Sequence, residues 1–261
     1  PIRPSTAIWR KRGKSMDRLQ LDKNAKLTGR VYFKDEVMWL GLSGSGASFT
    51  FDGTKLVLKL KGDNIAVGDN PIDYARIAVY VDGKRVVDEM IDCAEKEVTV
   101  IDRTENARSV VEIIKLSESP MSAVGIEAFA EGSAKALPEK PLKIEFIGDS
   151  ITCGYGVDDE DENHQFTTAT EDVTKAYAYK TAKALDAEYS MFSASGYGII
   201  SGYTEGDEPI SEQTIPQFYC SYGFSRGNFA GTAPQDIPWD FSKYIPQIIV
   251  INLGTNHDSY C

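Results

Sequence analysis

The chain has 261 residues, of which 42% are hydrophobic and 26% are charged, a balance typical of globular domains. This length allows one large domain or two domains of ordinary size. The formal net charge of −11 argues against a nucleic-acid partner, because phosphate backbones are bound by basic surfaces. No apolar run approaches the roughly 20 residues that cross a bilayer. We therefore expect no membrane span.

The first half of the chain reads as short strands joined by turns. Apolar residues alternate with others over 55–60 and 75–81, the period-2 pattern of strands with one buried face. Asp82-Gly83 follows the second run and is a hairpin signal. Further strand-like runs lie at 30–33, 47–51, 98–101, 110–116 and 124–129. Such spacing without an intervening helix predicts an all-β, jelly-roll-like sandwich over residues 1–135.

The pattern changes after the small, polar and Pro-bearing stretch at 131–141. Apolar strands are predicted at 142–147, 188–193 and 248–253, and a helix at 175–185 with Thr174 as its N-cap. Continuous apolar strands separated by helices are typical of a parallel sheet covered on both faces. We therefore predict an α/β domain over residues 136–261. Because such sheets usually have more strands, we expect this domain to be truncated at its C-terminus.

Each predicted strand of the second half runs into a polar, Gly-containing loop. These loops are Gly148-Asp149-Ser150, the segment 193–198, and Gly254-Thr255-Asn256. Open parallel sheets bind ligands beyond the carboxyl ends of their strands. A serine at a strand-to-helix turn lies at the positive end of a helix, and glycine N–H groups and an asparagine amide can donate to a developing oxyanion. This combination indicates ester cleavage.

The three segments, in this order, resemble the first three sequence blocks of the SGNH (GDSL-type) hydrolases. The preceding sandwich, the fuller segment 148–156 and the segment 166–171 make the match similar to two-domain acetyl esterases of carbohydrate esterase family 2. The resemblance implies a flavodoxin-like SGNH domain with Ser150 as nucleophile and oxyanion N–H donor. It also implies Gly196 as a second N–H donor, with Gly198 as the alternative, and the Asn256 side chain as a third donor.

The resemblance also implies a histidine base near the C-terminus, and neither histidine of this chain fits that pattern. His164 lies in an acidic run and is expected in a solvated loop rather than a metal site. His257 directly follows Asn256, where the pattern usually carries Asp. We therefore expect the general base to be absent from this chain, which leaves Ser150 weakly nucleophilic.

Aromatic residues near the loops are candidates for binding sugar rings. Tyr155, Tyr197 and Trp239 are the candidates, with His257 as a possible pocket residue. Tryptophans are more often buried, which is the expectation for Trp39. Cys153 is expected to be a packing residue, since no cation next to it in sequence would lower its pKa.

The resemblance implies a serine ester hydrolase that removes O-acetyl groups from plant polysaccharide such as xylan or mannan. Two alternatives remain open: an SGNH lipase or acyl-thioesterase acting on other acyl esters, and a non-catalytic carbohydrate-binding protein. Neither a metal nor a cofactor is expected, and the expected partner is acetylated carbohydrate. Secretion is expected from the habit of the family.

Overall fold

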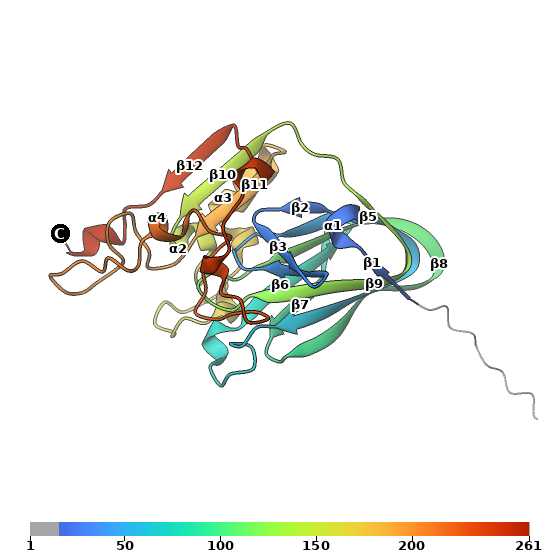
Figure 1. Ribbon diagram of the computed structural model, residues 1–261, viewed down its shortest axis with the longest axis horizontal. Helices are drawn as coiled ribbons and strands as arrows, with labels where there is room; N and C mark the ends of the chain where they lie inside the picture. The colour runs from blue at the N-terminus through green and yellow to red at the C-terminus, as the bar shows by residue number, and fades with distance from the viewer. Residues whose placement is uncertain (1–15, 261) are drawn as a thin grey trace, which may run out of the picture.

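The computed structural model describes residues 16–260, so the first fifteen residues of the predicted first domain lie outside the described part (Figure 1). The first domain is rich in strands, as predicted. Its elements are β1 (Asp17–Leu19), α1 (Leu21–Asn24), β2 (Lys26–Thr28), β3 (Val31–Lys34), β4 (Val37–Leu40), β5 (Gly46–Gly62), the 3₁₀ turn η1 (Pro71–Asp73), β6 (Ala75–Val81), β7 (Lys84–Ile91), β8 (Glu95–Lys115) and β9 (Val124–Ala136).

These strands pair only antiparallel, in the order β3-β4-β9-β5-β8-β6-β7, with β1 on β9 and β2 on β5. The long strand β5 bends in its middle. The large side chains that it places in the first domain's core are Phe49 and Phe51 before the bend but Leu56, Leu58 and Leu60 after it. A register shift between Gly53 and Lys55 changes the parity, so both halves of the strand face one core. The predicted Asp82-Gly83 hairpin joins β6 to β7, with positive φ at both residues.

The bend depends on a close approach of two backbones. Gly53 pairs with Gly132 of β9, and a Cβ at Gly53 would overlap the carbonyl oxygen of Glu131. We therefore expect Gly53→Ala to lower the free energy of unfolding by about 2 kcal/mol, as overpacking typically does. Urea titration would measure the loss. Gly223→Ala is the control, since its Cβ would meet only Leu42 at an ordinary 3.6 Å, and an equal loss in both variants would contradict the explanation.

The second domain has a three-stranded parallel sheet with one regular helix against it. Its strands are β10 (Lys143–Gly148), β11 (Glu188–Ser193) and β12 (Ile248–Asn252), in the order β11-β10-β12. The remaining elements are α2 (Ser150–Cys153), η2 (Thr168–Thr170), η3 (Val173–Lys175), α3 (Tyr177–Ala184), α4 (Ile215–Phe218), η4 (Pro234–Asp236), η5 (Phe241–Lys243) and η6 (His257–Tyr260). β9 ends at Ala136, next to the boundary predicted at 135/136.

The predicted start of the second domain's helix is wrong. The helix begins at Tyr177, and Ala176 before it has an extended conformation. Thr174 lies in the preceding 3₁₀ turn, where the Asp172 side chain accepts a hydrogen bond from the Thr174 N–H at 3.0 Å. Asp172 is itself fixed by Arg85 of β7 at 2.7 Å. A contact between domains therefore sets the cap, and the local sequence pattern could not reveal it.

The two domains lie side by side (Figure 1) and share a hydrophobic core. Ile114 and Leu116 of the first domain pack in one cluster with Ile144 and Phe146 of β10. The long segment between β11 and β12 also returns to the first domain, where the Tyr222 hydroxyl donates to the Trp39 carbonyl at 2.7 Å. The first domain thus supports the sheet that carries the predicted site.

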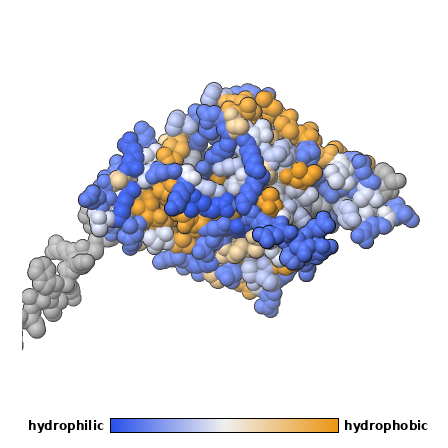
Figure 2. Space-filling view, turned by 180° about the vertical axis from the view of Figure 1, so that it is seen from behind, coloured by the Kyte–Doolittle hydropathy of each residue, from blue (hydrophilic) through white to orange (hydrophobic). Residues whose placement is uncertain are grey.

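β12 lies at an edge of the parallel sheet and exposes apolar side chains. Ile248, Ile249 and Ile251 are 44%, 53% and 63% exposed. Apolar surface runs along the upper edge of the molecule on the side of the second domain (Figure 2). β12 therefore leaves one edge and an apolar face of the parallel sheet exposed. Among residues 16–260, no helix is both long and apolar enough to cross a bilayer.

Candidate active site

Ser150 follows the central strand of the parallel sheet and begins α2. Asp149 caps this turn by accepting the Ile151 N–H at 3.1 Å, and Gly154 ends it in the left-handed conformation. A Cβ at Gly148 would overlap Thr152, so the tight exit from the strand requires glycine. Because α2 has only four residues, it contributes little of the expected helix dipole. Any stabilisation of an oxyanion must come from individual N–H groups.

The Gly196 turn follows β11, which is hydrogen-bonded to β10 along its length. Gly196 is left-handed, at φ 79°, and a Cβ added there would meet no atom within 4 Å outside its chain neighbours. Within residues 16–260, neither its N–H nor that of Ser150 has a hydrogen-bond partner. The Gly198 N–H, in contrast, donates to the Gln213 carbonyl at 3.2 Å. The geometry therefore favours Gly196 over Gly198 as a possible oxyanion donor.

Asn256 lies in the loop that follows β12 and is 7% exposed. Its side-chain Nδ2 donates to the Tyr197 carbonyl at 2.7 Å, which joins the third predicted loop to the second. A carboxamide has two N–H groups, so one donor is left for another acceptor. No hydrogen bond in the described part joins Asn256 or Gly196 to the Ser150 hydroxyl. Convergence of the three residues on one oxyanion therefore stays a prediction.

Neither histidine is hydrogen-bonded to Ser150 in the part of the chain that the structure describes. His164 is exposed in the acidic loop, with its Nδ1 2.8 Å from Asp159 Oδ1, which fits the expected solvated loop. His257 begins η6 beside Asn256, and its Nε2 lies 3.5 Å from Asp258 Oδ1. These contacts therefore do not identify either histidine as the general base for Ser150.

Tyr155 and Tyr197 have different surroundings. Tyr155 is 47% exposed and stacks on Phe166, with ring centroids 4.0 Å apart and planes inclined by 9°. The two rings line a pocket of about 440 Å³. Tyr155 is the first residue of its lining along the chain and follows Ser150 by five positions. Tyr197 instead packs against Phe218 and Phe224. Of the two tyrosines, Tyr155 is therefore the more accessible to a ligand.

Trp39 and Trp239 lie outside the three loops of the predicted site. Trp39 is 5% exposed and stacks on Phe229, as expected for a core residue. Trp239 is half-buried, with the Arg30 guanidinium 5.3 Å from its ring centroid, and lines a separate pocket with Tyr32 and Lys243. Its role in substrate binding stays a prediction.

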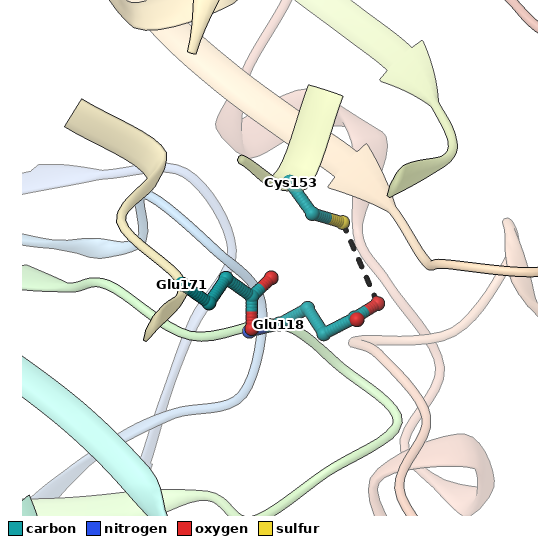
Figure 3. Close-up of side chains that lie close together, drawn as sticks. All are labelled: Glu118, Cys153 and Glu171. Carbon is teal, nitrogen blue, oxygen red and sulfur yellow. Dashed lines mark hydrogen bonds between the residues drawn. The ribbon is translucent and has the colours of Figure 1, made fainter. Parts of the chain in front are cut away.

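A buried ionisable cluster lies beneath the Ser150 turn, and the sequence analysis missed it. Glu118 of the β8–β9 loop, Cys153 of α2 and Glu171 after η2 point toward one another (Figure 3). Glu118 Oε2 accepts hydrogen bonds from the Ser195 N–H at 2.5 Å and from the Cys153 thiol at 3.5 Å. Lys115 Nζ donates to the Glu118 carbonyl at 3.1 Å. No sequence signal marks Glu118, because only the tertiary fold brings it to the Ser150 turn.

Burial controls the protonation of this cluster. Loss of hydration raises the pKa of the Glu118 and Glu171 carboxyls and raises that of the Cys153 thiol well above its usual range. The same effect lowers the pKa of Lys115 to about 8. Cys153 is therefore an inert packing thiol, as expected. The three acidic groups offer donor atoms within 4.8 Å of one another, but a neutral thiol and a neighbouring ammonium group do not suit a cation.

The fold and the loops define a two-domain protein, in which a strand-rich domain supports an α/β domain whose strand ends carry the candidate nucleophile. Residues 27–141 match the model of the family described as Carbohydrate esterase 2 N-terminal.

Two relatives and one solved structure extend the similarity over most of the chain. The cellulase/esterase CelE of Acetivibrio thermocellus is 32% identical over 235 residues, 87% of this chain and 26% of the relative. An acetylxylan esterase / glucomannan deacetylase of Cellvibrio japonicus is 28% identical over 90% of this chain and 62% of its own length. The structure of a family two carbohydrate esterase from Clostridium thermocellum, in complex with cellohexaose, superposes with a TM-score of 0.74. It is 28% identical, and the match covers 91% of this chain and 67% of that one. The chain thus spans about a quarter of the length of CelE and about three fifths of the length of the Cellvibrio japonicus esterase.

Proposed function

We propose that the protein is an SGNH-type carbohydrate esterase that removes O-acetyl groups from plant polysaccharide with Ser150 as its nucleophile. One observation carries the proposal: Ser150 follows the central parallel strand, and its N–H and that of Gly196 have no partner within residues 16–260. The acetylxylan esterase among the relatives supports the substrate class. We also propose that the first domain is a sandwich of the jelly-roll type. Secretion of the protein stays a prediction.

The chemistry follows from the roles of these groups. The Ser150 hydroxyl adds to the acetyl carbonyl carbon while a base takes its proton. The oxyanion accepts hydrogen bonds from the Ser150 and Gly196 N–H groups and from the Asn256 amide. The C–O bond to the sugar then breaks, and the sugar oxygen takes the proton. Water next attacks the acetyl-serine, releasing acetate and restoring the hydroxyl. The family resemblance implies a histidine as the base.

The exposed Tyr155 ring supports a carbohydrate substrate. Sugar rings present C–H faces that stack on aromatic side chains, and Phe166 holds the Tyr155 ring from its other side at 4.0 Å. The pocket beside this pair is bordered by carboxylates, including Asp159 and Glu160, which can accept hydrogen bonds from sugar hydroxyls. This position, shortly after Ser150 in the chain, suits the polymer backbone on which the acetyl group sits.

The proposal is tested by comparing the turnover of acetyl and octanoyl nitrophenyl esters by the full-length natural protein. Acetate release from acetylated xylan and from acetylated glucomannan is measured alongside. We expect acetate release from at least one polymer and turnover of the acetyl ester about tenfold faster or more than that of the octanoyl ester, as a small acyl site would impose. Faster octanoyl turnover would instead identify a lipase or acyl-thioesterase.

A second candidate function is non-catalytic carbohydrate binding, which is favoured by the exposed Tyr155 ring, because stacking on a sugar needs no catalytic group. Affinity electrophoresis in the same polymers separates the two functions. Retardation without any acetate release would support binding alone and contradict the esterase.

A further inference from the structure

The first domain contributes a side chain that touches both segments of the proposed oxyanion site. We propose that Glu118 is a positioning residue that holds the Ser195–Gly196 turn and the Ser150 turn in fixed relation. The inference rests on the proposed function, because positioning matters only if these segments perform the reaction. It assigns the first domain a part in the site beyond supporting the sheet.

One carboxylate oxygen makes the connection. Glu118 Oε2 accepts the Ser195 N–H at 2.5 Å, and Ser195 directly precedes Gly196. The same oxygen accepts the thiol of Cys153 at 3.5 Å, and Cys153 is the last residue of the turn that begins at Ser150. The two segments also contact each other through the 3.2 Å hydrogen bond between Cys153 Sγ and Ser193 Oγ, which joins residues 40 positions apart in the chain. Glu118 therefore couples the two turns through a single atom.

Glu118 is itself held firmly by neighbouring groups. Its side chain is fully buried, and its own N–H donates to Glu171 Oε2 at 2.9 Å. The Lys115 ammonium donates to the Glu118 carbonyl at 3.1 Å and to the Ser117 carbonyl at 2.7 Å. Lys115 is the last residue of the 21-residue strand β8. The backbone of Glu118 is thus anchored next to the end of β8, and the buried side chain extends from this fixed position, as a positioning group needs.

Other hydrogen bonds also restrain the Gly196 turn, but Glu118 is the group that holds the Ser195 N–H. The Tyr197 N–H donates to the Ala194 carbonyl at 3.3 Å, and the Gly196 carbonyl accepts the Tyr203 N–H at 2.8 Å. Without the acceptor at Glu118, the peptide before Gly196 can rotate and turn the Gly196 N–H away from Ser150. A misplacement of about 1 Å in such a site costs on the order of 100-fold in rate.

Three variants of the full-length protein test the inference in steady-state hydrolysis of nitrophenyl acetate. Glu118→Gln keeps a carbonyl acceptor in place, so we expect a kcat within about threefold of the natural protein. Glu118→Met removes the acceptor at nearly the same volume, and we expect kcat to fall about 10- to 100-fold with KM within about twofold. Glu118→Asp withdraws the carboxylate by one methylene and should also lower kcat, which keeps the test open if the Met variant does not fold.

Glu127→Met is the matched control. Glu127 is a buried carboxylate of the first domain that pairs with Arg18 at 2.7 Å and Lys61 at 2.8 Å, remote from the three loops. We expect it to lower the melting temperature while leaving kcat per folded molecule unchanged. A purely structural Glu118 would behave in the same way, with Glu118→Met changing stability but not kcat. That result would overturn the inference.

Amide hydrogen exchange over residues 193–198 gives a readout that needs no turnover. We expect faster exchange of this segment in Glu118→Met than in Glu118→Gln, and unchanged exchange in Glu127→Met. If the natural protein hydrolyses no ester while the exchange difference is present, the proposed function fails and the structural coupling stands. If hydrolysis is normal and both kcat and exchange are unaffected by Glu118→Met, the inference fails and the proposed function stands.

Discussion

Replacing Ser150 by alanine is expected to lower kcat for acetyl ester hydrolysis by on the order of 10⁴- to 10⁶-fold, with the fold intact. The reaction loses its nucleophile, and the remaining N–H donors can only polarise the ester for attack by water. The hydroxyl has no hydrogen-bond partner within residues 16–260 and its residue is half-buried, so little stability should be lost. The measurement is steady-state release of nitrophenol by the full-length protein.

Ser242→Ala makes the same chemical change at an exposed serine whose hydroxyl donates only to Asp240. It should leave kcat unchanged. Retention of more than about a tenth of the activity in Ser150→Ala would exclude Ser150 as the nucleophile. His257→Ala adds a test of the base, and we expect it to lower kcat far less than Ser150→Ala does. A loss of activity as large as that of Ser150→Ala would assign the base to His257.

Local patterns in the sequence were sufficient for several strands and for the order of the loops, but they divided each of the long strands β5 and β8 into two runs and gave no signal for β4. The alternation over 75–81 and the Asp82-Gly83 turn predicted β6 and its hairpin, because burial of one face and positive φ are properties of adjacent residues. The strand at 188–193 was predicted to the residue. Ser150 was placed at a strand end for the same reason.

Features that depend on distant partners were not predictable in this way. The parity change in β5 follows from the approach of Gly53 to Gly132, which are 79 residues apart. The cap at Thr174 failed as a prediction because Arg85 holds Asp172 from another domain. Glu118 carried no signal at all, since a single glutamate in a Ser-rich turn resembles a solvated loop until the fold buries it.

The same dependence on distant partners makes Arg30 the residue with the largest expected effect on stability. Its side chain is fully buried between the domains. It donates to the carbonyls of Tyr219 and Ser221 at 2.6 Å each, and its guanidinium lies 4.3 Å from the centroid of the Phe192 ring. Burial lowers the pKa of Arg30, while the neighbouring Glu145 carboxylate, 3.4 Å away, opposes that shift.

We expect Arg30→Ala to lower the free energy of unfolding by about 3–5 kcal/mol, because it leaves the Glu145 carboxylate buried without its cation. The carbonyls of Tyr219 and Ser221 also lose their donor. Removal of the guanidinium leaves a cavity between the aromatic rings that surround it. Urea titration at neutral pH measures the loss. Arg108→Ala removes an exposed arginine that lies 4.0 Å from Asp52 and should cost less than about 1 kcal/mol. A loss at Arg30 as small as that at Arg108 would mean that the shared apolar core alone holds the domains together, and that the proposed active site does not depend on this ion pair for its support.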